Sequence, residues 1–213
     1  LAGVETPTTG TIELDGQAVT FDSPAHAVSH GVALIHQELN LCPNLSIADN
    51  IFVGRERTKG AFVDFAAQRQ AAIDLLAHLE EPIDPSTLVG DLRLGQQQLV
   101  EIARALSEDA RVLIMDEPTS ALSATEVHVL FRVIRELTAR GVSIIYISHH
   151  LDECIELAHD AVILRDGNVV AQSPMAEVDL AWIVSKMVGR DESALFAPMA
   201  HDPGEAIFEV KDL

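Results

Sequence analysis

Short apolar runs recur along the chain, and between them the apolar residues are spaced as on one face of a helix. Apolar runs of about four to eight residues between turn signals are typical of strands buried on both faces. Three such runs predict strands, at residues 32–35, 112–115 and 142–147. Helices are predicted at about 24–30, 95–106, 123–139, 151–158 and 177–188. Strands that alternate with helices predict an α/β domain with a parallel sheet.

Two dipeptides predict tight hairpins outside this alternation. Asp15-Gly16 and Asp166-Gly167 each separate two short runs of strand-forming residues. Asp-Gly is favoured in two-residue hairpin turns because both positions tolerate a positive φ. We therefore expect one hairpin near the start of the chain and another near residues 161–171.

A helix-rich stretch at about residues 40–110 interrupts the alternation. Helices are predicted there at about 46–54 and 65–79, and Pro82 and Pro85 break the pattern after them. We expect this stretch to form a helical subdomain inserted into the α/β domain.

The composition excludes several functional classes. The chain has 33 acidic residues against 14 Lys and Arg, a formal net charge of −19. Non-specific binding to nucleic acid or to an anionic membrane surface needs clustered positive charge, which this balance disfavours. No apolar run approaches the ~20 residues of a membrane span. Cys42 and Cys154 have no metal-ligand spacing and are expected to be reduced thiols.

Polar residues follow each predicted strand of the parallel sheet. Asp116 and Glu117 follow residues 112–115, Gln37 follows the first strand, and His149 and His150 follow the third. Carboxyl ends of parallel strands meet at the edge where α/β sheets bind ligands. One carboxylate there can hold Mg²⁺, and its neighbour can orient or deprotonate a water. The adjacent histidines lack a matched set of ligands and do not indicate a metal site.

A possible anion-binding feature lies further upstream. Gly95 and Gln96 open the helix predicted at 95–106. A helix start led by glycine presents free backbone N–H groups that can bind phosphate. Each of these features alone also fits an ordinary strand end or helix start. The interpretation therefore rests on the order in which they occur along the chain.

Taken in order, these segments resemble the motifs of ATP-binding subunits of ABC transporters. Residues 36–41 resemble the Q-loop, and Leu-Arg-Leu-Gly-Gln at 92–96 resembles the signature sequence, which usually reads Leu-Ser-Gly-Gly-Gln. Residues 112–117 resemble Walker B, and 120–123 resemble the D-loop. His149 resembles the H-loop histidine, since the family histidine directly follows the serine at the strand end.

The resemblance implies a fold, two cofactors and a set of site residues. The fold would be a P-loop NTPase-like ABC ATPase domain with a helical subdomain, and the cofactors would be ATP and Mg²⁺. Asp116 would hold Mg²⁺, Glu117 would be the catalytic base, and His149 would stabilise the γ-phosphate. Gln37 would sense Mg²⁺ and the attacking water. The remaining nucleotide-binding positions would be Arg93, Gly95, Gln96 and Ser120. The first three belong to the signature segment and would act on ATP held by an opposing domain.

Three segments resemble the monosaccharide importers of the ribose/galactose/xylose type, namely residues 31–41, 96–103 and 186–190. In those proteins two ATPase domains are fused in one polypeptide. The resemblance then assigns residues 1–190 to a first ABC ATPase domain, 191–206 to a linker and 207–213 to the first strand of a second ABC ATPase domain.

The sequence departs from the family pattern in lacking a P-loop. Each of the three lysines, Lys59, Lys186 and Lys211, follows a residue other than glycine, whereas the P-loop needs Gly-Lys. We expect the P-loop and its strand to lie upstream, so that this chain is an N-terminally truncated domain without useful ATPase activity alone. Loss of a central strand is also expected to expose Ile35 and Leu113, together with Ile145.

The signature segment departs as well. Arg93 occupies the place of the usual serine, whose hydroxyl meets the γ-phosphate. A guanidinium can also donate to phosphate, but it is much longer than a hydroxyl. Arg93 could therefore serve that phosphate or mark a degenerate site, and the sequence leaves both interpretations open.

The interpretation is an ATP-hydrolysing module of a bacterial sugar importer, peripheral to the cytoplasmic face of the inner membrane. Its partners would be permease subunits that dock on the helical subdomain, a second ABC ATPase domain and, indirectly, a periplasmic sugar-binding protein, without nucleic acid. The alternatives are a nucleoside importer ATPase, a non-transport ABC protein and an inactive scaffold. Glu38-Leu39 disfavours the nucleoside class, which usually has His or Phe after the Q-loop glutamine. The acidic charge disfavours a role in translation or DNA repair.

Overall fold

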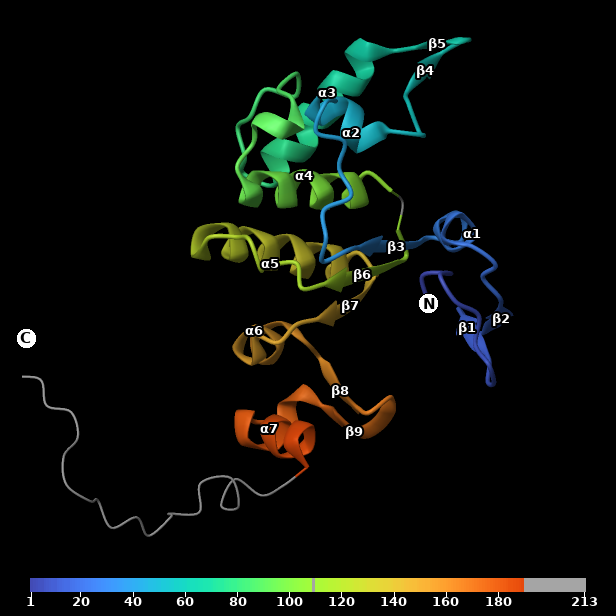
Figure 1. The fold of residues 1–213 in the computed structure, drawn as a ribbon, viewed down its shortest axis with the longest axis vertical. Coiled ribbons are helices and arrows are strands. Elements are labelled where there is room, and N and C mark those ends of the chain that lie inside the picture. Colours follow the sequence, from blue (N-terminus) through green and yellow to red (C-terminus); the bar gives the residue numbers. More distant parts are fainter. Residues whose placement is uncertain (109, 190–213) are drawn as a thin grey trace, which may run out of the picture. The chain divides into compact units, whose positions relative to one another are not determined.

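The computed structural model describes residues 1–108 and 110–189 (Figure 1). It divides into two compact units, Leu1–Leu157 and the part of the chain from Ala158 onward. The expected linker at 191–206 and the expected strand at 207–213 lie outside the described residues, as does Arg190.

A three-stranded parallel sheet forms the centre of the first unit. Its strands, in spatial order, are β3 (Val32–Ile35), β6 (Val112–Asp116) and β7 (Ser143–Ile147). Ile35 pairs with Met115, and Met115 pairs with Tyr146, so the three strands end at one edge. The prediction of an α/β domain with parallel strands is confirmed.

Two long helices build the main core together with this sheet. They are α4 (Leu94–Leu106) and α5 (Ala124–Ala139). Leu130, Val133 and Ile134 of α5 have the spacing of one helix face, and all three are buried in the same cluster as the strand residues. The predicted capping box of α5 is present, because Glu126 N–H donates to Ser123 Oγ and Ser123 N–H donates to the Glu126 carboxylate.

The expectation that Ile35 and Leu113 are exposed is wrong. Ile35 is 0% exposed and Leu113 is 1% exposed. Leu113 lies on β6, which is paired on both sides, and both residues belong to the core cluster that includes α4 and α5. Ile145 on β7 is half-buried, and in the described part of the chain β7 pairs with β6 alone.

The inserted stretch is helical and packs on α4. It contains α2 (Ile47–Phe52), α3 (Phe65–His78) and the 3₁₀ turn η1 (Val89–Asp91). Helix α2 ends at Phe52, earlier than predicted, and a short hairpin of β4 (Thr58–Lys59) and β5 (Phe62–Val63) follows. Strands of two residues are too short to give an alternating pattern, so the sequence did not predict this hairpin.

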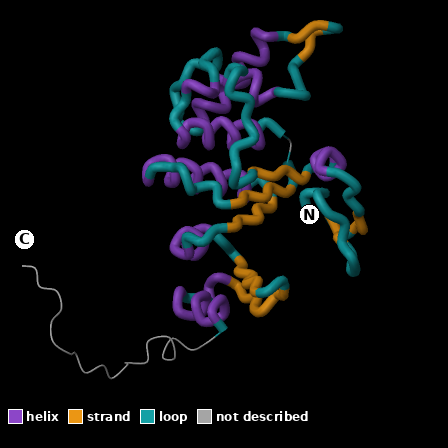
Figure 2. Tube along the Cα trace, viewed as in Figure 1, coloured by secondary structure: helices purple, strands orange, loops and turns teal. Residues whose placement is uncertain are grey.

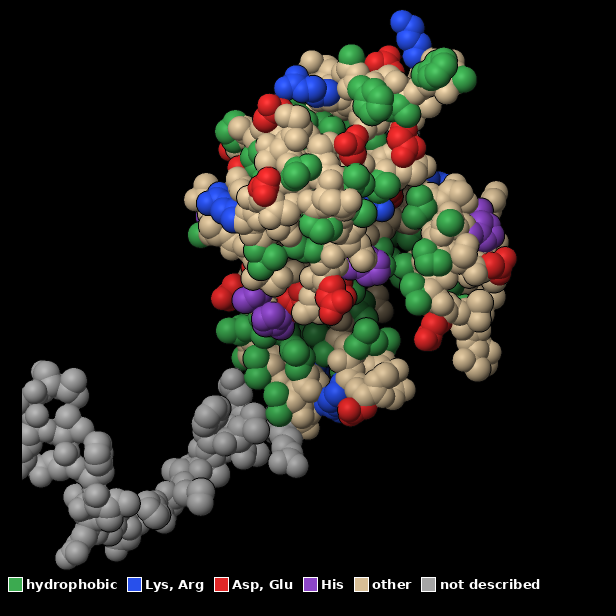
Figure 3. All heavy atoms as spheres, turned by 45° about the horizontal axis from the view of Figure 1, so that its top comes forward, with side chains coloured by type: hydrophobic (Ala, Val, Ile, Leu, Met, Phe, Trp, Pro, Cys, Tyr) green, Lys and Arg blue, Asp and Glu red, His purple; other side chains and the backbone are tan. Residues whose placement is uncertain are grey.

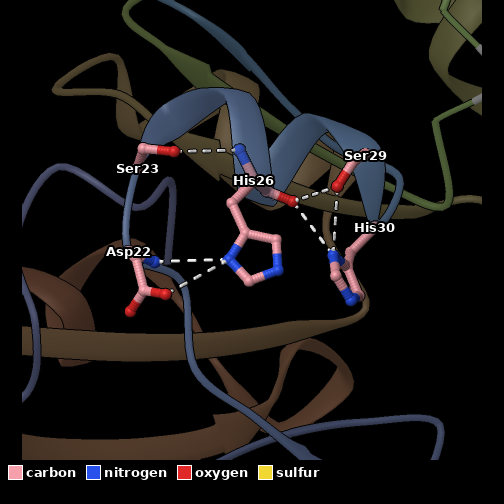
Figure 4. A network of polar contacts seen from close by, with 5 residues as sticks. All are labelled: Asp22, Ser23, His26, Ser29 and His30. Atoms are coloured by element: carbon pink, nitrogen blue, oxygen red, sulfur yellow. Dashed lines mark hydrogen bonds and ion pairs between the residues drawn. The ribbon is translucent and has the colours of Figure 1, made fainter.

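A hairpin and a short helix precede the sheet. Strands β1 (Ile12–Leu14) and β2 (Gln17–Val19) join at the predicted turn, where Asp15 and Gly16 have φ of 50° and 73°. Helix α1 (Pro24–Ser29) follows, and Figure 4 shows Ser23 Oγ accepting the N–H of His26 at 3.2 Å. This cap satisfies one of the free N–H groups at the helix start.

The second unit is a hairpin followed by a helix. The hairpin joins β8 (Asp160–Arg165) to β9 (Asn168–Pro174) through Asp166 and Gly167, again at positive φ. A 3₁₀ turn, η2 (Met175–Glu177), leads to α7 (Leu180–Val188). Helix α7 begins later than predicted because Asp179 caps it, accepting the N–H of Trp182 at 2.7 Å.

The tube view in Figure 2 separates the helices from the strands and loops of the described residues. Among residues 1–108 and 110–189, none of the helices combines the length and the apolar composition needed to cross a membrane. Figure 3 shows acidic side chains scattered over one face of the molecule, with Lys and Arg isolated from one another on that face.

Candidate active site

Several polar residues lie at the edge where the strands of the sheet end. Asp116 is the last residue of β6 and Glu117 follows it, while Gln37 lies after β3 and His149 lies after β7. The carboxyl edge of a parallel sheet is where α/β folds bind ligands. The structure therefore places four of the predicted site residues at this edge.

Glu117 has an unusual backbone conformation. Its φ is 50°, in the left-handed region, which costs an L-residue other than Gly roughly 1–2 kcal/mol. Its backbone N–H donates to the carbonyl oxygen of Ile147 at 2.9 Å, which fixes Glu117 beside the end of β7. Strained backbone held in place by its neighbours is a frequent feature of functional sites.

The carboxylate of Glu117 contacts the imidazole of His149. Glu117 Oε2 lies 2.8 Å from His149 Nδ1; the Glu117 side chain is 13% exposed and the His149 side chain is 69% exposed. This contact is not aligned as a hydrogen bond, so the buried Oε2 atom has no hydrogen-bond partner among the described residues. Its lone pairs therefore remain available to a further donor, such as a water molecule.

Asp116 and Gln37 have free oxygen atoms at the same edge of the sheet. Asp116 is half-buried and Gln37 is exposed, and within the described residues neither side chain takes part in a hydrogen bond or ion pair. The structure thus brings Gln37 to the edge without joining it to Asp116 or Glu117.

The oxygen donors at this edge fit Mg²⁺. Mg²⁺ prefers oxygen ligands and is usually held by one or two carboxylates together with the phosphates of a substrate. Asp116 supplies such a carboxylate, and the amide oxygen of the exposed Gln37 is a second oxygen donor at this edge. Within residues 1–108 and 110–189, no three or more His, Cys, Asp or Glu side chains are grouped as they would be in a metal site.

The segment 36–41 is anchored to α4. Asn40 N–H donates to Glu101 Oε2 at 3.2 Å, and Arg104 donates to the carbonyl oxygen of Asn40 at 3.1 Å. Glu101 is 5% exposed, and burial raises the pKa of its carboxyl group, while the Asn40 N–H and the nearby Arg104 and His36 oppose that shift. A signal of this anchor in the sequence is the carboxylate of Glu101 among the buried positions of α4, most of which are apolar.

The start of α4 lies beside the start of α5. Arg93 is the N-cap residue of α4 but makes no capping hydrogen bond, and its guanidinium lies 3.4 Å from Glu126 Oε1. The Arg93 side chain is 70% exposed. The helix begins at Leu94, one residue earlier than the sequence predicted.

Gly95 allows the close approach of the two helix starts. A Cβ atom at Gly95 would lie 3.0 Å from the carbonyl oxygen of Ala121 and 3.4 Å from the Glu126 carboxylate. Gln96 donates to Glu81 at 3.0 Å, and the backbone N–H of Ser120 lies 3.4 Å from the carbonyl oxygen of Glu117.

The predicted site residues therefore form two groups. Arg93 and Gly95 lie near the segment from Ala121 to Glu126, and in the described part of the chain no hydrogen bond or ion pair links them to Glu117 or His149. Ser120 belongs to the loop that joins β6 to α5. An arrangement in which one group serves ATP held by the other domain remains an expectation of the resemblance.

Three further polar residues beside the site were missed from the sequence. Thr119, Tyr146 and Glu153 form a hydrogen-bonded cluster behind Glu117 and His149. Nothing in the spacing of these residues predicts their meeting, because they come from a loop, a strand and a helix.

Comparison with known proteins agrees with this architecture. The family model described as ABC transporter matches residues 1–120. The chain is 45% identical over its whole length to the ribose import ATP-binding protein RbsA 3 of Rubrobacter xylanophilus and covers 43% of that protein. It is 47% identical over 205 residues to a putative ribose/galactose/methyl galactoside import ATP-binding protein of Burkholderia ambifaria, covering 96% of this chain and 40% of the relative. The chain thus spans less than half the length of these curated relatives.

Solved structures share the fold at lower identity. The ATP-binding cassette MJ1267 of an ABC transporter superimposes with a TM-score of 0.74 at 22% identity, covering 88% of this chain and 79% of the other. The post-hydrolysis dimer of the cassette MJ0796, bound to ADP and Pi, gives a TM-score of 0.71 at 21% identity, covering 82% and 77%. The predicted P-loop NTPase-like cassette fold is confirmed, and the chain belongs to the ABC transporter family.

Proposed function

We propose that the longer protein containing this chain is an ATP-hydrolysing subunit that energises import of a monosaccharide through a bacterial ABC transporter. Two similar proteins are named for ribose import and for ribose/galactose/methyl galactoside import. Their identity to this chain, 45% and 47%, extends over nearly all of it. The proposal concerns the longer protein, because the chain covers less than half of each relative.

The observation that carries the proposal is the free, buried Oε2 atom of Glu117 at the carboxyl edge of the sheet. A carboxylate oxygen with an unused lone pair can accept the proton of a water that attacks a phosphate. His149 Nδ1 lies 2.8 Å from that oxygen and its side chain is exposed, so in this proposal the imidazole would reach a phosphate oxygen from its exposed side. Asp116 and Gln37 would hold Mg²⁺, which neutralises phosphate charge when it is bound.

The remaining site residues would act on a second copy of the nucleotide site. The N-terminus of α4 with Arg93, Gly95 and Gln96, together with Ser120, would meet ATP held by an opposing ABC ATPase domain, in the same polypeptide or in a second copy. Backbone N–H groups at a helix start favour phosphate, which supports this role. The exposed Arg93 would add a positive charge there.

The other partners follow from the same proposal. The helical subdomain would dock on permease subunits at the cytoplasmic face of the inner membrane, and a periplasmic sugar-binding protein would deliver the sugar to that permease. The net charge of −19 disfavours nucleic acid as a partner.

The test is ATP turnover of the full-length protein reconstituted with its permease in liposomes. Binding proteins loaded with ribose, galactose, xylose or a nucleoside are added in turn. We expect a sugar to stimulate phosphate release in the wild type, no stimulation in Glu117→Gln, and wild-type behaviour in Glu156→Gln, which changes an exposed carboxylate on α6 (Leu151–Leu157). Stimulation by nucleosides alone would favour the nucleoside class, and no turnover at all would favour an inactive scaffold.

A further inference from the structure

The carboxylate of Glu153 accepts hydrogen bonds from two hydroxyl groups. Glu153 Oε2 accepts the hydroxyl of Thr119 at 2.9 Å and the hydroxyl of Tyr146 at 2.7 Å. Thr119 is 5% exposed, and Tyr146 and Glu153 are half-buried. Hydrogen bonds to an ionised carboxylate are about twice as strong as neutral ones. Thr119, Tyr146 and Glu153 therefore form a strong hydrogen-bonded junction.

The three residues come from the three segments that surround the Glu117–His149 contact. Thr119 lies in the loop that begins with Glu117, and Tyr146 lies on β7, three residues before His149. Glu153 lies in the first turn of α6, whose amides at Glu153 and Cys154 donate to the carbonyl oxygen of His150. The Glu153 carboxylate thus bonds to the strand before the turn that carries His149, and the backbone N–H groups of Glu153 and Cys154 bond to the residue after it.

The protonation state of Tyr146 agrees with its part in this junction. Burial raises the pKa of the Tyr146 phenol, and the bonded Glu153 carboxylate raises it further. The phenol therefore stays protonated near neutral pH and remains a donor to Glu153. Thr119 supplies the second donor at any pH.

We propose that Glu153 is a positioning residue that holds the Glu117 loop and the His149 turn at the distance at which the two side chains meet. The proposal rests on the proposed ATPase function, because only that function assigns chemistry to Glu117 and His149. Among the described residues Glu153 forms no hydrogen bond or ion pair with either side chain, and it acts through Thr119, Tyr146 and the start of α6. A displacement of about 1 Å at a reacting group can lower a rate by about 10²-fold, so a junction of this kind affects turnover.

The first test measures turnover of the full-length protein with its permease. Glu153→Ala is expected to lower kcat at least about tenfold with KM for ATP within about twofold of wild type, because the hydroxyl groups lose their acceptor while the nucleotide site keeps its other contacts. Glu153→Gln is expected to restore most of the rate, because its amide oxygen can accept both hydroxyls. Glu156→Ala is the matched control on the same helix, where the carboxylate makes an exposed ion pair with Arg135. Equal rates for Glu153→Ala and Glu156→Ala would overturn the proposal, and so would a failure of Glu153→Gln to exceed Glu153→Ala.

The second test does not depend on ATP. The imidazole signals of His149, assigned by their loss in His149→Ala, are compared by NMR in Thr119→Val and in Thr125→Val, an exposed threonine on α5. We expect Thr119→Val to shift these signals and Thr125→Val to leave them unchanged, with thermal melts showing that both variants are folded. Unchanged His149 signals in folded Thr119→Val would overturn the positioning role whatever the ATPase result. A shift in Thr119→Val combined with no ATPase activity in the wild type would instead overturn the proposed function and support the junction.

Discussion

His149 Nδ1 lies 2.8 Å from Glu117 Oε2, although the two residues follow different strands of the sheet. The contact arises because β6 and β7 are adjacent and parallel, so that residues after their carboxyl ends become neighbours. The N–H of Glu117 adds a backbone bond to Ile147 that holds this corner in place. The buried Oε2 atom of Glu117 beside the exposed imidazole of His149 is the arrangement on which the prediction for Glu117 depends.

Glu117→Gln in the full-length protein is expected to abolish ATP turnover and to leave ATP binding nearly intact. An amide keeps the size of the carboxylate but cannot accept the proton of water, and a general base typically supplies ~10²–10⁴-fold in rate. The variant also removes a negative charge beside the triphosphate, so binding is expected to hold or tighten. The measurements are ATP affinity and steady-state turnover, with permease present. Retention of more than about a tenth of wild-type turnover would exclude Glu117 as the base.

Asp116→Asn is expected to give a different phenotype from its neighbour. A neutral amide is a poorer ligand for a hard dication than a carboxylate, so ATP affinity should fall in the presence of Mg²⁺. The ATP affinity measured with EDTA should change little, since no metal is then held. Equal loss of affinity with and without Mg²⁺ would argue that Asp116 supports the fold and does not hold the metal.

Arg93, which is exposed, forms an ion pair with the half-buried Glu126, and the two residues are expected to contribute differently to stability. Arg93→Ala should change the free energy of unfolding by less than about 1 kcal/mol, because exposed ion pairs contribute little. Glu126→Ala should cost about 1 kcal/mol, because Glu126 also completes the capping box of α5. Urea unfolding of both variants beside wild type measures the difference, and a larger loss in Arg93→Ala would contradict it.

The pH dependence of the Glu126 contribution has a defined sign. The hydrogen bond with the Ser123 side chain, helped by the Ser123 N–H and by Arg93, lowers the pKa of Glu126. A carboxyl group with a lowered pKa adds stability above its unfolded pKa and loses it as the pH falls through the folded value. The stability difference between wild type and Glu126→Gln should therefore shrink on acidification. A difference that grows below pH 4 would refute this account.

The sequence predicted the sheet, the main helices and the strand-end residues because these depend on local patterns. A buried strand of four apolar residues followed by Asp116-Glu117 is visible without a fold, and parallel pairing then brings His149 nearby. The junction at Glu153 could not be predicted in this way, since its partners are distant in sequence and are united only by packing.

Exposure was also mispredicted for a physical reason. Ile35 and Leu113 were expected to be uncovered by the loss of a strand, but the helices and the neighbouring strands bury both. Leu113 lies on β6, which is paired on both sides by β3 and β7. None of the five residues of the outer strand β7 is fully buried, and Ile145 is half-buried there.

The last prediction concerns Glu101, which anchors Asn40 from α4. Burial raises the pKa of Glu101 in the folded state, so the folded chain binds more protons than the unfolded chain between the normal and the raised value. The contribution of Glu101 to the free energy of unfolding is therefore fully present below the normal pKa of a glutamate. It is lost as the pH rises from that value through the raised pKa of the folded state. Glu101→Gln removes this titration while its amide oxygen still accepts the N–H of Asn40.

The free energy of unfolding of Glu101→Gln relative to wild type should therefore rise from acidic to neutral pH and level off above the raised pKa. The sign follows because ionisation of the buried Glu101 lowers the free energy of unfolding of the wild type and cannot occur in Glu101→Gln. Arg104 and His36 reduce this loss. Urea unfolding at intervals between pH 4 and pH 8 measures the trend, and Glu38→Gln, an exposed carboxylate in the segment 36–41, is the matched control. A relative stability that falls with pH would mean that attraction to Arg104 outweighs burial, and the Asn40 anchor would then depend on the charge of Glu101.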